Sequence, residues 1–326
     1  MKSRRLSATG AIHDHQHQGS LATTDKTVVR HMHRPLELRR LKNEPHSEMT
    51  QATCPACCTA LEVKSQLSYQ RCGACGLLFA WPMEAGSKEW YGESGIYSDQ
   101  AEPSESAFLT DARHLAFFEG ATAPGRLLDL GCGAGTFLRH ARSRGFQVAG
   151  IEFQSALAMR ANEQGLAVDS GDLASTLAKG TEHYDYITAF DVLEHLEDPG
   201  QVVELMLARL RSGGVCAVTV PHADRVPASF DPVIDAPPHH LTLWTGAAIR
   251  QLFQRQGASS CEVQELPLTT DDLFLHYLWK RYGHGLARTT RRDGLVRRKL
   301  AVQVGLRNAF KMSKGHTLLV LAKPPI

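Results

Sequence analysis

Short apolar runs alternate with segments of helical periodicity from Arg126 to the end of the chain. Compact runs rich in Val, Leu and Ile are typical of buried strands, whereas apolar residues spaced three or four apart are typical of helices. The pattern predicts strands at 126–131, 146–152, 166–171, 184–190, 215–221, 261–268 and 316–324. It predicts helices at 104–120, 136–145, 198–211 and 245–257, and one more that closes at Gly165. This alternation is typical of a parallel α/β fold.

The chain before this pattern divides into two parts. Residues 1–50 are rich in His, Arg, Ser and Thr and have no apolar periodicity, so we interpret them as a disordered tail, or Met49 as the first residue of the protein. Residues 51–98 form a small cysteine-bearing module and linker, and 99–326 form the main domain, in which 269–314 is a helical basic insert.

A glycine-rich turn follows the first predicted strand in LLDLGCGAGTFL, residues 127–138. Its glycines are Gly131, Gly133 and Gly135, and Thr136 stands where a dinucleotide-binding motif has its third glycine. Asp129 lies two residues before the first glycine, and its carboxylate would repel a pyrophosphate. A ligand with cationic groups and a carboxylate, such as S-adenosylmethionine, fits this turn better.

The segment DLGCGAGTFL resembles motif I of the class I S-adenosylmethionine-dependent methyltransferases, and the resemblance extends over residues 105–325. It implies a Rossmann-like seven-stranded sheet whose last strand, in HTLLVLAKP, is antiparallel and lies between the fifth and sixth strands. The residues that it assigns to the cofactor are Asp129, Gly131, Gly133, Gly135, Glu152, Asp172, Leu173 and Asp191. Glu152, about 20 residues beyond the glycines, would suit the ribose of NAD equally well.

Four of the eight cysteines form the pairs CPAC and CGAC, at Cys54, Cys57, Cys72 and Cys75. This spacing is close to that of a structural zinc site, in which four thiolates leave no open position for chemistry. The alternative is a reduced, metal-free hairpin. The module is similar to the zinc-ribbon leader of many small-molecule methyltransferases, which implies that Trp90, Tyr91 and Tyr97 pack over the mouth of the active site. Simple linker packing is the alternative for these three residues.

Candidate general bases lie after the fourth and fifth predicted strands. They are Asp191, Glu194, His195, His222, His239 and His240. We favour His240, followed by His239 and His222, because a diproline stiffens the loop APPHHLTLW and could aim an imidazole at the cofactor. Each histidine could instead be merely packed or exposed.

The segment DVLEH offers a second interpretation, because it is similar to the E-x-x-E-H metal motif of small-RNA and quinone-pathway O-methyltransferases. Asp191 replaces the first glutamate, which shortens the arm, and Glu194 and His195 could instead only order the loop. The (N/D)-P-P-(Y/F) clamp of base-methylating enzymes is absent after the fourth strand, which argues against chemistry on DNA or RNA bases.

Charge and hydropathy limit the possible partners. The net charge is only +2, and neither a membrane-spanning apolar run nor a secretory signal is present, so we expect a cytoplasmic protein. Residues 280–314 nevertheless carry eleven Lys or Arg and one acid. This segment is either a lid helix with a solvated basic face or a contact for an anionic substrate or, through 294–311, a membrane surface. A homodimer is also compatible with the sequence.

The sequence therefore predicts an S-adenosylmethionine-dependent methyltransferase that acts on an oxygen or carbon atom of a small molecule, such as a sugar or a glycan or lipid-linked precursor. Two alternatives stay open: an RNA-directed 2′-O-methyltransferase, with or without a metal, and a non-catalytic scaffold that binds S-adenosylmethionine.

Overall fold

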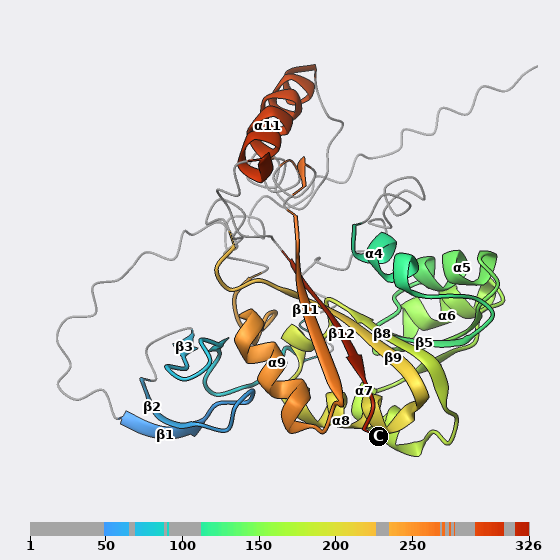
Figure 1. Ribbon diagram of the computed structural model, residues 1–326, viewed down its shortest axis with the longest axis horizontal. Helices are drawn as coiled ribbons and strands as arrows, with labels where there is room; N and C mark the ends of the chain where they lie inside the picture. Colours follow the sequence, from blue (N-terminus) through green and yellow to red (C-terminus); the bar gives the residue numbers. More distant parts are fainter. Residues whose placement is uncertain are drawn as a thin grey trace, which may run out of the picture. The chain divides into compact units, whose positions relative to one another are not determined.

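Figure 1 shows the computed structural model, which describes residues 49–64, 69–87, 90, 112–225, 235–267, 269–270, 274, 277, 291–309 and 317–325. The predicted tail lies outside these residues except for Met49 and Thr50, which belong to the first strand. Tyr91, Tyr97 and the first eight residues of the helix predicted at 104–120 also lie outside them.

A seven-stranded sheet forms the centre of the main domain. Its strands are β5 (Arg126–Leu130), β6 (Gln147–Glu152), β7 (Val168–Ser170), β8 (Tyr184–Phe190), β9 (Leu210–Pro221), β11 (Ser260–Leu266) and β12 (Thr317–Lys323). They lie in the order β11-β12-β9-β8-β5-β6-β7, and β12 is antiparallel to both of its neighbours while β5 to β9 pair in parallel. The predicted fold class and the position of the last strand are confirmed.

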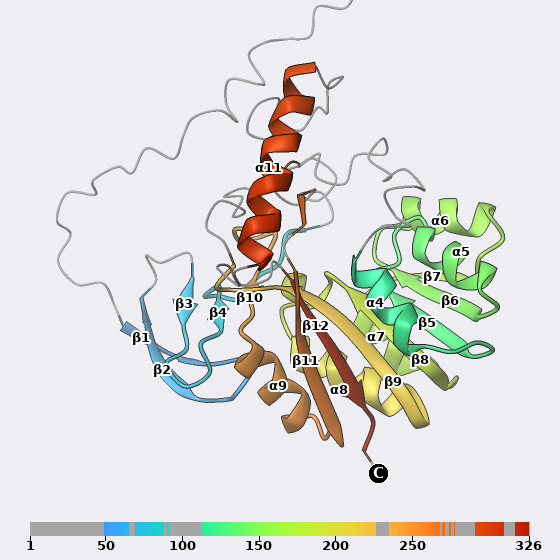
Figure 2. The ribbon, with the colours of Figure 1, turned by 45° about the horizontal axis from the view of Figure 1, so that its top comes forward.

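Helices cover both faces of this sheet (Figure 2). They are α4 (Ala112–Gly120), α5 (Thr136–Ser143), α6 (Ser155–Glu163), α7 (Leu173–Lys179), α8 (Pro199–Arg209) and α9 (Gly246–Arg255), and the basic insert contains α11 (Arg291–Ala309). Side chains of α4, α5 and α6 share one apolar cluster, and those of α7, α8 and α9 share a second cluster. Among the described residues, no helix is both long enough and apolar enough to pass through a bilayer.

Local sequence explains most of the helix boundaries. Asp198 and Thr245 cap α8 and α9, because their side chains accept hydrogen bonds from the N–H groups of Gln201 and Ala248. The helix predicted at 198–211 corresponds to α8, but its predicted end at Arg211 is wrong. α8 ends at Arg209, and Leu210 already belongs to β9. Helix α7 had no counterpart among the predicted elements.

The cysteine module consists of short strands, β1 (Met49–Thr53), β2 (Ala60–Lys64), β3 (Gln70–Arg71) and β4 (Leu78–Phe79). β1 pairs with β2, whereas β4 lies between β3 and β10 (Thr242–Leu243), a strand of the main domain. Leu77 and Phe79 are fully buried in the same apolar cluster as Trp244 and Phe253. The module and the main domain therefore share one hydrophobic core.

Candidate functional site

The glycine turn joins the end of β5 to the start of α5. Gly131 has φ 65° and Gly135 has φ 81°, which is the left-handed region that favours glycine. A Cβ at Gly131 would lie 2.8 Å from Val192, and one at Gly135 would lie 2.2 Å from Leu166, so both positions also lack room for a side chain. A Cβ at Gly133 would meet nothing within 4 Å, and the turn is therefore open on that side.

Two buried carboxylates flank the turn. Asp129 accepts a hydrogen bond from Thr188 Oγ1 at 2.6 Å, and burial raises its pKa to about 7. Glu152 accepts hydrogen bonds from the N–H groups of Gly133 and Gln154, each at 2.8 Å, and burial raises its pKa as well. The negative charge of Glu152 adds to the raised pKa of Asp129, so a cationic ligand beside Asp129 would be favoured. The assignment of these two acids and the three glycines to S-adenosylmethionine stays a prediction.

Asp172 and Leu173 lie at the start of α7, beyond β7. Asp172 is the N-cap of this helix and accepts a hydrogen bond from Ser175 N at 2.8 Å, while Leu173 is buried. Asp172 thus has a structural role at a helix end. The contact with adenine that the resemblance implies stays a prediction.

Asp191 follows β8 directly and has φ 55°. Its Oδ1 accepts a hydrogen bond from Thr219 Oγ1 at 2.9 Å, and its Oδ2 pairs with the guanidinium of Arg113 on α4. Both carboxylate oxygens therefore have partners within the chain. This engagement weakens the interpretation of DVLEH as a carboxylate-rich metal motif.

His195, His239 and His240 lie together. His195 belongs to the short helix η1 (Leu193–His195) after β8, and the other two follow the diproline. The ring centroid of His195 lies 4.6 Å from that of His239 and 4.8 Å from that of His240. The ring of His239 stacks on that of His240, with their centroids 4.7 Å apart. One ring nitrogen from each lies within 4.8 Å of the others, a spacing that could hold a metal ion. His222 instead lies 3.6 Å from Glu265 of β11 and is not part of this cluster.

The surroundings of His195 and His240 keep both rings neutral. Burial lowers the pKa of each imidazole below its ordinary value. His195 donates its Nδ1 hydrogen to the carbonyl of His239 at 2.7 Å, and His240 Nδ1 lies 3.1 Å from the carboxylate of Asp235. The contact with the carbonyl places the hydrogen of His195 on Nδ1. His240 Nδ1 has the Asp235 carboxylate beside it but makes no hydrogen bond of good geometry among the described residues. A neutral imidazole with an acid close to Nδ1 makes His240 a candidate general base.

Glu194 lies next to this cluster and is 1% exposed. Its Oε2 has no hydrogen-bond partner within the part of the chain that the structure describes, and burial raises the pKa of its carboxyl to about 8. The carboxyl is therefore protonated at neutral pH, although Arg113 and Arg225 favour its ionised form. The protonated carboxyl of Glu194, beside three imidazoles, is a candidate proton donor.

The ring centroid of Trp90 lies 6.1 Å from that of His239. Whether Trp90 packs over the mouth of an active site or only against the linker stays a prediction. The sequence-based expectations did not include Asp235, Arg225, Arg113 or Tyr69. Asp235 could have been noticed, because an acid stands just before the diproline, but the other contacts join segments far apart in the chain.

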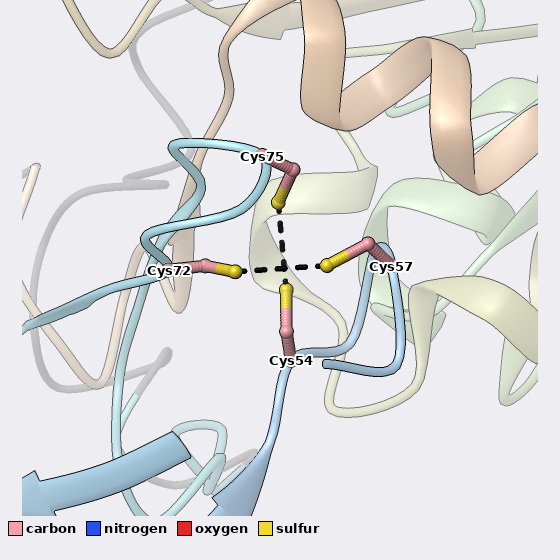
Figure 3. Close-up of side chains that lie close together, drawn as sticks. All are labelled: Cys54, Cys57, Cys72 and Cys75. Atoms are coloured by element: carbon pink, nitrogen blue, oxygen red, sulfur yellow. Dashed lines mark hydrogen bonds between the residues drawn. The ribbon is translucent and has the colours of Figure 1, made fainter. Parts of the chain in front are cut away.

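The four paired cysteines converge on one centre (Figure 3). Their sulfur atoms all lie within 4.8 Å of one another, and the Cys54–Cys75 and Cys57–Cys72 pairs are each 3.6 Å apart. A tetrahedral zinc ion with Zn–S bonds of about 2.3 Å separates its sulfurs by about 3.8 Å, so this set fits zinc. Cys58 is directed elsewhere and contacts the guanidinium of Arg255.

The comparisons with known proteins agree with this geometry. Residues 104–262 match the family described as Methyltransferase domain. This match, which covers just under half of the chain, and the sheet order support the resemblance to the class I S-adenosylmethionine-dependent methyltransferases.

Two bacterial relatives are both named Ubiquinone biosynthesis O-methyltransferase. The one from Caulobacter vibrioides is 34% identical over 125 residues, which cover 36% of this chain and 47% of the relative. The one from Marinobacter nauticus is 34% identical over 113 residues, which cover 32% and 47%. The chain thus spans about half the length of the curated relatives that it matches. A solved S-adenosylmethionine-dependent methyltransferase from Archaeoglobus fulgidus is 16% identical with a TM-score of 0.48, covering 66% of this chain and 93% of that one.

Proposed function

We propose that the chain transfers a methyl group from S-adenosylmethionine to a hydroxyl oxygen of a small-molecule acceptor, with His240 as general base. The observation that carries the proposal is the neutral, buried His240 with Nδ1 3.1 Å from Asp235. Oxygen is preferred to carbon because the relatives named above are O-methyltransferases.

The mechanism assigns one task to each group. S-adenosylmethionine, when bound, would supply an electrophilic methyl carbon and a sulfur leaving group that keeps both electrons of the broken bond. Asp129 and Glu152 hold the cationic part of the cofactor beside the glycine turn. His240 Nε2 takes the proton from the acceptor hydroxyl as its oxygen bonds to the methyl carbon, and Asp235 stabilises the resulting imidazolium.

The acceptor class is also a proposal. A phenolic acceptor is suggested by the names of the relatives, whereas a sugar or lipid-linked precursor is suggested by the basic insert. Leu295 and Val302 of α11 are 59% and 64% exposed and lie seven residues apart, so they project from one side of the helix near Arg298 and Lys299. We therefore propose that α11 contacts an anionic lipid surface from which such an acceptor is taken.

The test combines binding and turnover. Purified protein is incubated with methyl-labelled S-adenosylmethionine and fractionated cell metabolites, and mass spectrometry identifies any compound that gains a methyl group. A labelled hydroxyl compound supports the proposal. Cofactor binding by calorimetry with no labelled product in any fraction would favour the non-catalytic scaffold, and labelled RNA would favour the RNA-directed alternative.

A metal ion at His195, His239 and His240 is the second candidate for activating the acceptor, because their ligand nitrogens gather within 4.8 Å. Dialysis against EDTA separates the two mechanisms. Unchanged turnover supports His240 as a free base. Turnover that is lost while the zinc content stays constant, and is then restored by Mg²⁺ or Mn²⁺, assigns the three imidazoles to metal binding, because thiolate sites do not favour these two ions.

A further inference from the structure

Tyr69 of the cysteine module reaches the loop that carries the proposed base. Its hydroxyl oxygen lies 2.7 Å from the backbone carbonyl of Asp235 and 2.7 Å from that of His240. The single hydroxyl hydrogen can serve either carbonyl, so this one group joins the two ends of the segment that separates the proposed base from its orienting acid. Both residues lie more than 160 positions away from Tyr69 in the chain.

The loop of residues 235–241, called here the histidine loop, lies between two supports. On the side of the main domain, Leu241 donates its N–H to the carbonyl of Glu194 at 2.6 Å, and His195 donates to the carbonyl of His239. On the side of the cysteine module, Ala80 donates its N–H to the carbonyl of Leu241 at 2.8 Å. The two residues after the loop form β10, which pairs with β4 of the module.

Only Tyr69, among these module contacts, touches the backbone of both members of the Asp235–His240 pair. Tyr69 is largely buried, and its proximity to the Asp235 carboxylate, after burial, is a cause of its raised pKa. The hydroxyl therefore stays protonated and stays a donor at any physiological pH. A displacement of about 1 Å at a reacting group can reduce a rate by about 100-fold, so a contact that fixes this loop has catalytic weight.

We propose that Tyr69 is a positioning residue for methyl transfer: its hydroxyl fixes the spacing of Asp235 and His240, and the cysteine module thereby forms part of the catalytic apparatus. The proposal rests on the function proposed above, because it takes His240 to be the general base. It also gives the module a role beyond its own folding.

The test compares Tyr69→Phe with Tyr186→Phe in the full-length, zinc-loaded protein. Tyr186 is a matched control, because its hydroxyl also donates to a backbone carbonyl, that of Thr122, on a different part of the main domain. The assay uses methyl-labelled S-adenosylmethionine and the metabolite fraction that the unmodified protein methylates. We expect Tyr69→Phe to lower kcat at least about tenfold, with the Kd for S-adenosylmethionine and the zinc content unchanged, and Tyr186→Phe to leave kcat within about twofold.

A double-mutant cycle separates positioning from a general structural effect. If Tyr69 acts through the pair, Tyr69→Phe added to Asp235→Asn lowers kcat much less than it does alone. Hydrogen exchange should also become faster in the histidine loop and stay unchanged in residues 126–152. Wild-type kcat for Tyr69→Phe, or full additivity with Asp235→Asn, would overturn the proposal.

The two proposals fail in different ways. If His240→Gln keeps full turnover, the general-base assignment is wrong whatever Tyr69 does. If His240→Gln abolishes turnover while Tyr69→Phe does not affect it, only the positioning role is wrong.

Discussion

Thr188 of β8 donates its hydroxyl hydrogen to the buried carboxylate of Asp129 on the neighbouring strand β5, across 2.6 Å. The hydrogen bond partly offsets the desolvation of Asp129, yet burial still raises the pKa of this carboxyl to about 7. The protein therefore maintains an acid whose ionised form is costly without a cationic ligand. This cost makes Asp129 a test of the proposed cofactor site.

Replacing Asp129 with Asn should abolish detectable binding of S-adenosylmethionine in calorimetry, because the amide keeps the shape of the side chain and loses its charge. The same variant should be more stable than the unmodified protein at pH 8 without ligand, by at least about 1 kcal/mol, the equivalent of roughly one pKa unit. Urea unfolding at pH 8 measures the difference. Cofactor binding that survives the substitution would contradict the assigned role.

The dependence on pH follows from the same group. Its folded pKa is raised above the ordinary value of 3.8, so its contribution to stability is present at low pH and is lost as pH rises through about 7. The advantage of Asp129→Asn over the unmodified protein should therefore be larger at pH 8 than at pH 6. The affinity for S-adenosylmethionine should decrease as pH falls below 7, because protonation removes the charge of Asp129. For one titrating group, the decrease is at most about tenfold per pH unit. A pH-independent Kd would count against Asp129 as the ligand's acid.

Replacing His240 with Gln should lower kcat by about 100-fold or more, the usual range for loss of a general base, with little change in the Kd for S-adenosylmethionine. Asp235→Asn should give a smaller loss, because the imidazole stays and only its orienting acid is removed. His183→Gln is the control, since His183 is exposed on the surface. Equal kcat for His240→Gln and His183→Gln would exclude His240 as the base.

Cys57→Ser should remove zinc from the cysteine module and lower its thermal stability, whereas Cys58→Ser should keep one zinc ion per chain. Cys58 has φ 59°, the conformation that Gly76 has in the second turn with φ 79°, so Cys58→Gly should keep zinc and relieve backbone strain of about 1 kcal/mol or more. Metal analysis by mass spectrometry and thermal unfolding provide the measurements. Full zinc content in Cys57→Ser would contradict the proposed ligand set.

Reversing two charges on α11, Arg298→Glu with Lys299→Glu, should reduce co-sedimentation with vesicles that contain phosphatidylglycerol. Each cation near such a surface contributes about 1 kcal/mol, so the loss should be about tenfold or more. Lys179→Glu with Lys323→Glu is the matched control, because both side chains are exposed on other elements. Equal sedimentation of the two double variants would remove the membrane contact from the proposal.

Much of the architecture could be predicted from the sequence, because it depends on local signals. Apolar runs and capping residues give the strands and most helices, while the glycine turn and the cysteine pairs are contiguous motifs. Helix α7 was missed because LASTLAK is a single short segment with little apolar periodicity. The end of α8 was placed too late because the register of β9 shifts opposite Tyr184 and Tyr186, which brings Leu210 into the strand.

The residues of the proposed catalytic site come from segments that only folding brings together. His239 and His240 were noticed because they follow a diproline, but nothing local indicates that His195 lies beside them. Tyr69 meets the same loop across 166 and 171 positions, so its role depends on the folded chain. The charge of Arg113 opposite Asp191 likewise depends on α4 lying against the end of β8.

Thr245 shows what this interdependence means for protein engineering. Its hydroxyl accepts the N–H of Ala248 at the start of α9 and donates to the carbonyl of Cys75 at 2.7 Å. A chimera that carried only the cysteine module on another transferase would lack this hydroxyl group. We expect recombination between such enzymes to give folded protein when residues 49–87 and 235–257 are exchanged together as one unit.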